Sequence, residues 1–280
     1  MDSDDPTKED TVAAVTDPSE VGREFHNAGD RLTITVSNLF AWFFPFLMMI
    51  ICVQVVLRTL GRAGIGPGNQ AWMDDLQWWL YGAAVLIGIG YAVTTNSHVR
   101  VDIFYDSFPE RKKRRFDIFA LTWLFLPFII LCWDVTIHYA IASVVADEGS
   151  SSPNGLHNLW ILKVFMNVSF IVLGVAAWSA YVRLLAELTE PKLWRKLLYA
   201  FPSTMFLVNL VVFYAIWWVI FLTSPEGTQT RAVGRNAIFD EFEFGNWEIK
   251  YTIAITLVAT LLLIALARVL DRSAASRGNK

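Results

Sequence analysis

Six stretches of the chain are almost wholly apolar, and polar or charged segments separate them. Each stretch is close to the roughly 20 residues that a helix needs to cross the hydrocarbon core of a membrane. The pattern therefore predicts an all-α fold, a polytopic membrane helix bundle with about six transmembrane helices. The helices are expected at residues 39–57, 76–95, 116–138, 159–181, 199–223 and 249–267.

Pro45 falls within the first of these stretches and Pro127 within the third. A proline within a helix lacks the backbone N–H that would bond to the preceding turn, and its ring crowds that turn. Pro45 therefore predicts a kink or a break in the first helix, and Pro127 predicts a kink in the third.

The composition agrees with a membrane protein. Hydrophobic residues make up 55% of the chain and charged residues 18%, and the mean hydropathy is +0.43. A soluble domain of this length needs more charge to cover its surface. Cys52 and Cys132 lie inside apolar stretches, and we interpret them as packing residues. The sequence shows no basic patch with interleaved aromatic residues, so we expect no nucleic-acid partner.

The basic residues predict how the chain crosses the membrane. Lys and Arg near the ends of spanning helices accumulate on the cytoplasmic side. The loops after the second and fourth helices and the C-terminal tail carry fourteen Lys and Arg residues, against five in the other loops. Both termini are therefore expected to be cytoplasmic. We expect residues 1–37 to form a disordered cytoplasmic arm without a cleavable signal, because the arm is mostly polar and acidic.

Few polar groups lie inside the predicted helices. Asp134 and Lys163 lie near the outer ends of the third and fourth helices, where each can reach the interface or pair with the other. Asn167 and Asn209 are expected to form hydrogen bonds between helices. No helix carries the row of carboxylates typical of an ion pathway, which argues against a self-contained carrier.

The four histidines do not predict a haem or metal site. In the expected topology His98 lies at the inner face and His138 at the outer face, so they cannot share one iron. His138 and His157 lack an accompanying set of Cys or carboxylate ligands. No convincing phosphate-binding loop or nucleophile motif appears either. We expect no cofactor and no catalytic activity.

Three further segments suggest surfaces for contact. Ala84, Gly88 and Ala92 are spaced four apart in the second helix, an arrangement that lets two helix backbones approach closely. Residues 99–117 form either a short helix in the headgroup layer or a solvated basic loop attracted to anionic lipid. The loop 224–250 alternates acidic and aromatic residues, and it acts either as an interfacial anchor or as a contact for another protein.

Two short motifs frame the second helix, and their members are Trp72, Asp74 and Asp75 at its start and His98, Arg100 and Asp102 after its end. Pro109 and the basic run 111–115 come next. This order resembles the small membrane subunit (DctQ type) of tripartite ATP-independent periplasmic, or TRAP, transporters. The resemblance covers roughly residues 38–188, and Trp160 and Arg183 also fit it.

The resemblance implies a non-catalytic four-helix domain at residues 38–188 that scaffolds a larger permease subunit of the DctM type. That permease would hold the substrate and sodium sites, and a periplasmic binding protein would deliver an organic acid to it. The same resemblance implies a bacterial inner-membrane location, with membrane lipid as the remaining contact. Residues 189–280 add two transmembrane helices, an acidic aromatic periplasmic loop and a short basic tail that shorter members lack. Asp75 stands where the family more often has Glu.

Several alternatives stay open at the level of sequence. Asp74 and Asp75 either cap the second helix or meet a basic residue of a partner. The second motif, at residues 98–102, forms a local ion-pair network, a contact with the partner, or both. For the whole chain, the alternative function is the membrane anchor subunit of a respiratory oxidoreductase.

Overall fold

The computed structural model describes residues 23–97, 105, 107–225, 230–244 and 247–277. Within this part of the chain six helices are long and apolar enough to cross a membrane. They correspond one to one to the six apolar stretches of the sequence, which confirms the all-α membrane fold. The orientation of the termini stays a prediction.

The elements in chain order are η1 (Arg23–Phe25), α2 (Ala28–Ala41), α3 (Phe43–Arg62), α4 (Ala71–Thr95), α5 (Glu110–Phe119), the π-helical turn η2 (Ala120–Phe125), α6 (Leu126–Val145), α7 (Trp160–Leu188), α8 (Leu193–Tyr199), α9 (Phe201–Thr223), α10 (Thr230–Val233), η3 (Ala237–Phe239), β1 (Glu241–Phe244), β2 (Trp247–Lys250) and α11 (Tyr251–Arg277). The two strands form one antiparallel hairpin, which the sequence did not predict.

Residues 28–37 were expected to belong to a disordered arm, but they form the first part of helix α2. Asn27 begins this helix with a capping box: its side-chain oxygen accepts from the backbone N–H of Gly29 and Asp30, and its own N–H donates to the Asp30 carboxylate. Such reciprocal bonds satisfy N–H groups that a helix start otherwise leaves unpaired. Asp30, Thr33 and Ser37 lie buried along one face of α2. A buried face made of polar residues gives no hydropathy signal, which is why the helix was not predicted. Residues 1–22 lie outside the described part.

The break predicted at Pro45 is present. Helix α2 ends at Ala41 and α3 begins at Phe43, so the two helices follow each other with only Trp42 between them. Pro45 has no N–H to donate to the carbonyl of Ala41, four residues earlier. The missing bond lies at the position where the helix is interrupted.

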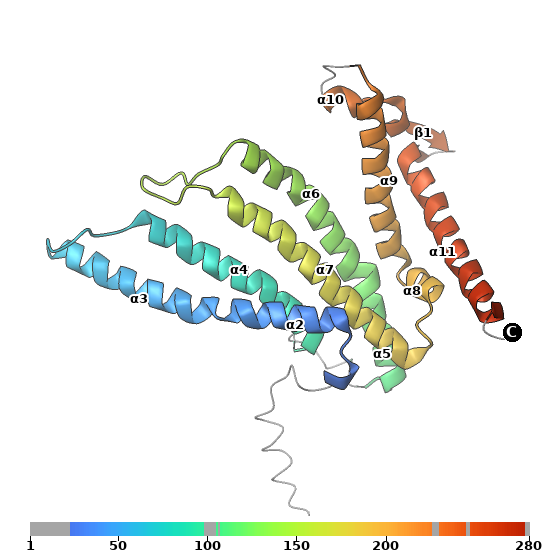
Figure 1. The fold of residues 1–280 in the computed structure, drawn as a ribbon, viewed down its shortest axis with the longest axis horizontal. Helices are drawn as coiled ribbons and strands as arrows, with labels where there is room; N and C mark the ends of the chain where they lie inside the picture. The colour runs from blue at the N-terminus through green and yellow to red at the C-terminus, as the bar shows by residue number, and fades with distance from the viewer. Residues whose placement is uncertain (1–22, 98–104, 106, 226–229, 245–246, 278–280) are drawn as a thin grey trace, which may run out of the picture. The chain divides into compact units, whose positions relative to one another are not determined.

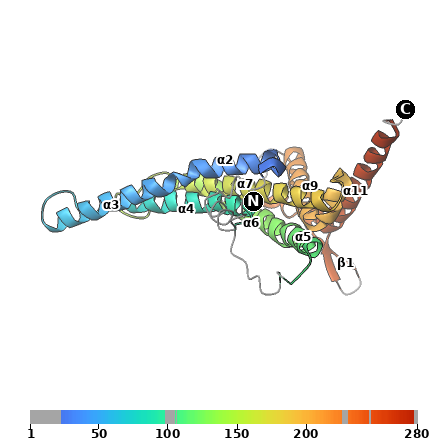
Figure 2. The same cartoon turned by 90° about the horizontal axis from the view of Figure 1, so that it is seen from below.

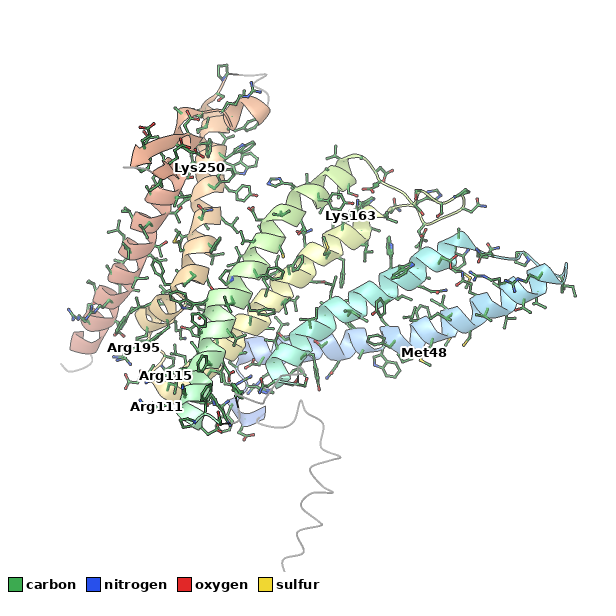
Figure 3. All side chains as sticks on the ribbon, turned by 180° about the vertical axis from the view of Figure 1, so that it is seen from behind. Met48, Arg111, Arg115, Lys163, Arg195 and Lys250 are labelled. Carbon is green, nitrogen blue, oxygen red and sulfur yellow. The ribbon has the colours of Figure 1, made fainter. Side chains whose placement is uncertain are left out.

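The described residues fall into two compact units. The first unit contains the chain up to Pro109 and Val135–Arg183, and so α2, α3, α4, the second half of α6 and most of α7. Helix α4 runs alongside both α2 and α3 (Figures 1 and 2). Leu47 and Ile50 of α3 pack with Met73 and Leu80 of α4 in an apolar core. Other α3 side chains point outward, such as Met48, which is 67% exposed (Figure 3).

The second unit contains Glu110–Asp134 and the chain from Leu184 onward. Helices α9 and α11 form an adjacent pair in it, with α8 at one end and the β hairpin at the other (Figure 1). The π-helical turn η2 lies directly before Pro127, and the N–H of Leu126 donates to the carbonyl of Leu121. The Thr122 carbonyl is therefore left free to accept from the hydroxyl of Ser203 on α9. The proline and the turn thus create an acceptor that joins two helices.

Candidate functional site

Asp74 lies in the first turn of α4 and holds that helix to α3. Its Oδ1 accepts a hydrogen bond of 2.6 Å from the side-chain amide of Gln54 and lies 3.6 Å from an Arg58 guanidinium nitrogen. Arg58 also donates to the Asn69 side-chain oxygen in the loop between the helices, at 2.9 and 3.2 Å. Gln54 is only 5% exposed and accepts from Gln77, one turn further along α4. The first acidic residue of the motif therefore fixes the α3–α4 hairpin.

Asp75 makes a different connection. Its Oδ2 accepts a 2.9 Å hydrogen bond from the backbone N–H of Leu156, in the loop between α6 and α7. Nearby Gly155 has no room for a side chain, because an added Cβ would lie 2.7 Å from the same Asp75 oxygen. The acidic residue thus ties the start of α4 to a loop 81 positions away.

Neither carboxylate occupies the N-cap position of α4, although Asp74 lies in the first turn, where a negative charge suits the helix dipole. Gln70 is the N-cap of α4 and makes no side-chain capping bond. Asp74 and Asp75 instead bond to groups from other parts of the chain. Trp72, beside them, is 40% exposed.

The small residues of α4 divide between two faces of that helix. Ala84 is buried, together with Ala83, Ile87 and Gly90. A Cβ added to Gly90 would lie 3.2 Å from a Thr33 methyl group of α2 and 3.8 Å from Ala176 of α7, so this glycine permits a close three-helix approach. A Cβ added to Gly88 would meet no described atom within 4 Å. The intrachain contact therefore uses Gly90, while Gly88 and the half-buried Ala92 remain on a more open face.

His98, Arg100 and Asp102 lie outside the described residues, so their predicted network or partner contact stays a prediction. The end of α4 directly before them is held by a polar clamp. A guanidinium nitrogen of Arg183 on α7 lies 2.8 Å from the Asp30 carboxylate, and a second donates to the Thr94 carbonyl at 2.7 Å. The Asn27 side chain of the capping box also donates to the Ser179 carbonyl of α7 at 2.9 Å.

We call Asp30, Thr94 and Arg183 the inner clamp, because it joins α2, α4 and α7. The Asp30 side chain is fully buried and that of Arg183 is 18% exposed. Arg183 was noted in the sequence only as part of a family pattern, and Asp30 was placed in the disordered arm. The combination of Asn27 with an acidic residue three positions later is the local signal by which the helix start could have been found.

Asp134 and Lys163, for which the sequence left a mutual pairing open, each have a partner of their own. Lys163 forms an ion pair with Glu148 in the following loop, and its ammonium group lies 3.8 Å from the centre of the Tyr139 ring. Asp134 accepts a 2.9 Å hydrogen bond from the Tyr214 hydroxyl of α9. Figure 3 shows Lys163 near the start of α7.

Replacing Glu148 should remove an acid-sensitive part of the stability. The bonds that Glu148 accepts from Lys163 and Ser143 lower the pKa of its carboxyl below the ordinary value. A carboxylate with a lowered pKa stabilises the fold above its unfolded pKa, and this contribution disappears as the pH falls through the folded value. We therefore expect Glu148→Gln to melt below the parent protein near neutral pH, and the two melting temperatures to converge below about pH 4. Melting curves across this pH range measure the effect.

The matched control is Glu243→Gln, which makes the same change at an exposed position without a described ion pair. This control should follow the parent at every pH. An identical acid dependence of Glu148→Gln and the parent would contradict the assignment.

The two asparagines form the interhelical bonds that the sequence predicted. Asn167 of α7 accepts from the Thr136 hydroxyl of α6 at 3.1 Å and donates to its carbonyl at 3.3 Å. Asn209 of α9 accepts from Thr256 of α11 at 3.2 Å. Among the described residues, no group of His, Cys, Asp and Glu is placed to hold a metal ion. Asn167 and Asn209 thus serve to hold helices together.

These features define a multi-pass membrane protein in which several buried polar side chains join helices. The family model for the DctQ component of tripartite ATP-independent periplasmic transporters matches residues 47–187, and the chain belongs to this family. The chain is similar to the ectoine TRAP transporter small permease protein TeaB of Halomonas elongata. The two are 21% identical over 165 residues, which is 58% of this chain and 83% of that protein. No solved structure matches the chain.

Proposed function

We propose that this chain is the small membrane subunit that scaffolds a large TRAP permease of the DctM type. The large subunit would carry out the sodium-coupled uptake of an organic acid delivered by a periplasmic binding protein. The match of the DctQ family model over residues 47–187 is the observation that carries the proposal. In this proposal the protein lies in the bacterial inner membrane, has both termini in the cytoplasm and catalyses no reaction.

The internal contacts support a bracing role. Asp74 and Asp75 fix the outer end of α4, and the inner clamp fixes its other end. A helix held at both ends can present a constant surface to a partner, because rigid elements position an interface more reliably than mobile ones.

We place the partner surface on the open face of α4. Gly88 and Ala92 lie there, and the neighbouring side chains of Tyr81, Val85 and Ile89 are exposed. These residues are spaced three or four apart and so lie along one side of the helix. A small residue at the centre of such a side lets another helix approach closely. Trp72 and the motif of His98, Arg100 and Asp102 are further proposed contacts at the two ends of the helix.

Isolation from native membranes tests the assembly. The full chain, tagged at its C-terminus, is purified in mild detergent from its host. We expect a permease of the DctM family to be isolated with it in a fixed stoichiometry. Isolation with subunits of a respiratory enzyme and with the Soret absorbance of haem would contradict the proposal and favour the alternative function.

A further inference from the structure

A tryptophan at one end of the second unit is in contact with two arginines. The Arg195 guanidinium carbon lies 5.3 Å from the centre of the Trp194 ring, and that of Arg268 lies 5.2 Å from it. Trp194 and Arg195 belong to α8, whereas Arg268 lies far along α11. An ion pair of 3.5 Å between Lys192 and Asp271 also links the two helices. We call Trp194, Arg195 and Arg268 the α8–α11 basic site.

The two guanidinium groups of this site have no carboxylate partner among the described residues. The described hydrogen bonds of Arg195 go to neutral acceptors, the Thr189 hydroxyl at 2.5 Å and the Glu190 carbonyl at 3.4 Å. Arg268 is exposed at the surface, and its described contact is with the Trp194 ring.

The acidic side chains closest in sequence to the site already have cationic partners. Glu190 and Asp271 both pair with Lys192, and Glu187 pairs with Arg114 of α5 at 2.8 Å. Two like charges gathered at one indole ring repel each other, and an added anion would relieve that repulsion. The site therefore has the charge that suits an anionic ligand.

The position of the site along α11 corresponds to a membrane surface. Arg268 lies about 17 residues beyond Tyr251, or roughly 25 Å along the helix axis, which is close to the thickness of the hydrocarbon core. The apolar side chains of Leu193, Leu198 and Tyr199 on α8 are exposed beside it. Exposed apolar groups next to guanidinium groups without a described carboxylate partner suit a ligand with both acyl chains and a phosphate.

We propose that the α8–α11 basic site binds the phosphodiester headgroup of an anionic phospholipid. Guanidinium groups bind phosphate oxygens through paired N–H donors. Tryptophan favours the depth of the headgroups, where its ring is half in the apolar layer. Acyl chains would then lie along the exposed leucines of α8.

The basic helix α5 extends the same surface. Within the second unit, Figure 3 shows Arg111 and Arg115 toward the same end as Arg195, with Lys250 at the opposite end. The excess of basic residues assigns this end to the cytoplasmic leaflet. The site lies beyond the residues that match the family model. The inference that it binds lipid is therefore independent of the proposed transport role.

Lipid counting by native mass spectrometry tests the proposal. The full-length protein, delipidated in neutral detergent, is titrated with phosphatidylglycerol, with phosphatidylcholine of the same acyl chains, or with inorganic phosphate alone. We expect the parent protein to prefer phosphatidylglycerol. Replacing both arginines, Arg195→Gln with Arg268→Gln, should weaken that binding about 30-fold, and each single replacement should weaken it about 5-fold.

The control is Arg62→Gln with Arg235→Gln, which removes two exposed arginines elsewhere and leaves the net charge equal to that of the test variant. This control should keep the parent affinity. If the double test variant does not fold, the two single variants decide. Unchanged phosphatidylglycerol binding in the variants, equal binding of both lipids by the parent, or inorganic phosphate binding as tightly as the lipid would each overturn the proposal.

Discussion

Replacing Arg183 with methionine is expected to destabilise the protein by about 3–5 kcal/mol, because it leaves a buried carboxylate without its cation. The Asp30 side chain is fully buried, and its described ion pair is with Arg183. Methionine fills part of the same space but cannot offset the charge. The variant should therefore melt roughly 10 °C or more below the parent. Thermal unfolding in detergent, followed by tryptophan fluorescence, measures the change.

Two further variants separate the loss of the ion pair from a general effect of the substitution. Arg62→Met makes the same change at an exposed position and should leave the melting temperature nearly unchanged. Adding Asp30→Asn to Arg183→Met removes the unpaired charge, so the double variant should recover part of the loss. A melting temperature for Arg183→Met equal to that of Arg62→Met would show that the inner clamp does not stabilise the fold.

Valine at Gly90 is expected to lower stability by about 1–3 kcal/mol, whereas valine at Gly88 should not. At Gly90 the first added carbon already lies 3.2 Å from Thr33, and the valine methyl groups would force α2 or α7 away from α4. At Gly88 the same carbon meets no described atom within 4 Å. Melting temperatures of the two isolated variants provide the comparison.

The same pair of variants tests where the partner binds. If the open face of α4 contacts the large permease, Gly88→Val should retain its own stability and yet lose much of the co-isolated permease. If Gly88→Val melts like the parent and also co-isolates as much permease as the parent, the interface lies elsewhere. Loss of stability at Gly88 but not at Gly90 would contradict the packing described for α4.

The spanning helices could be predicted because the bilayer imposes a length and a composition on each of them. Pro45 marked the break between α2 and α3 for an equally local reason, the loss of one backbone donor. Asn167 and Asn209 were predicted as interhelical bonds because a lone amide in an apolar helix needs a partner. In each case the signal lies within one segment of sequence.

The contacts of the motif residues could not be predicted in the same way. The sequence marked Asp75 as a motif residue but did not indicate its partner. That partner is a backbone N–H 81 residues away, and no local pattern reveals a contact over such a distance. Lys163 forms its ion pair with Glu148 in the adjacent loop. The sequence alone had left open a pairing with Asp134 in another helix. Helix α2 was not predicted because its buried face is polar. The low hydropathy around Asp30 and Thr33 indicated a disordered segment, whereas both side chains are buried in a helix.

The most direct test of an accessory role is uptake by host cells that lack this chain but retain the large permease and the binding protein. The labelled solute is the one that the purified binding protein retains. We expect its uptake to be abolished by the deletion and restored when the chain is supplied from a plasmid. Undiminished uptake without the chain would contradict the role proposed for it.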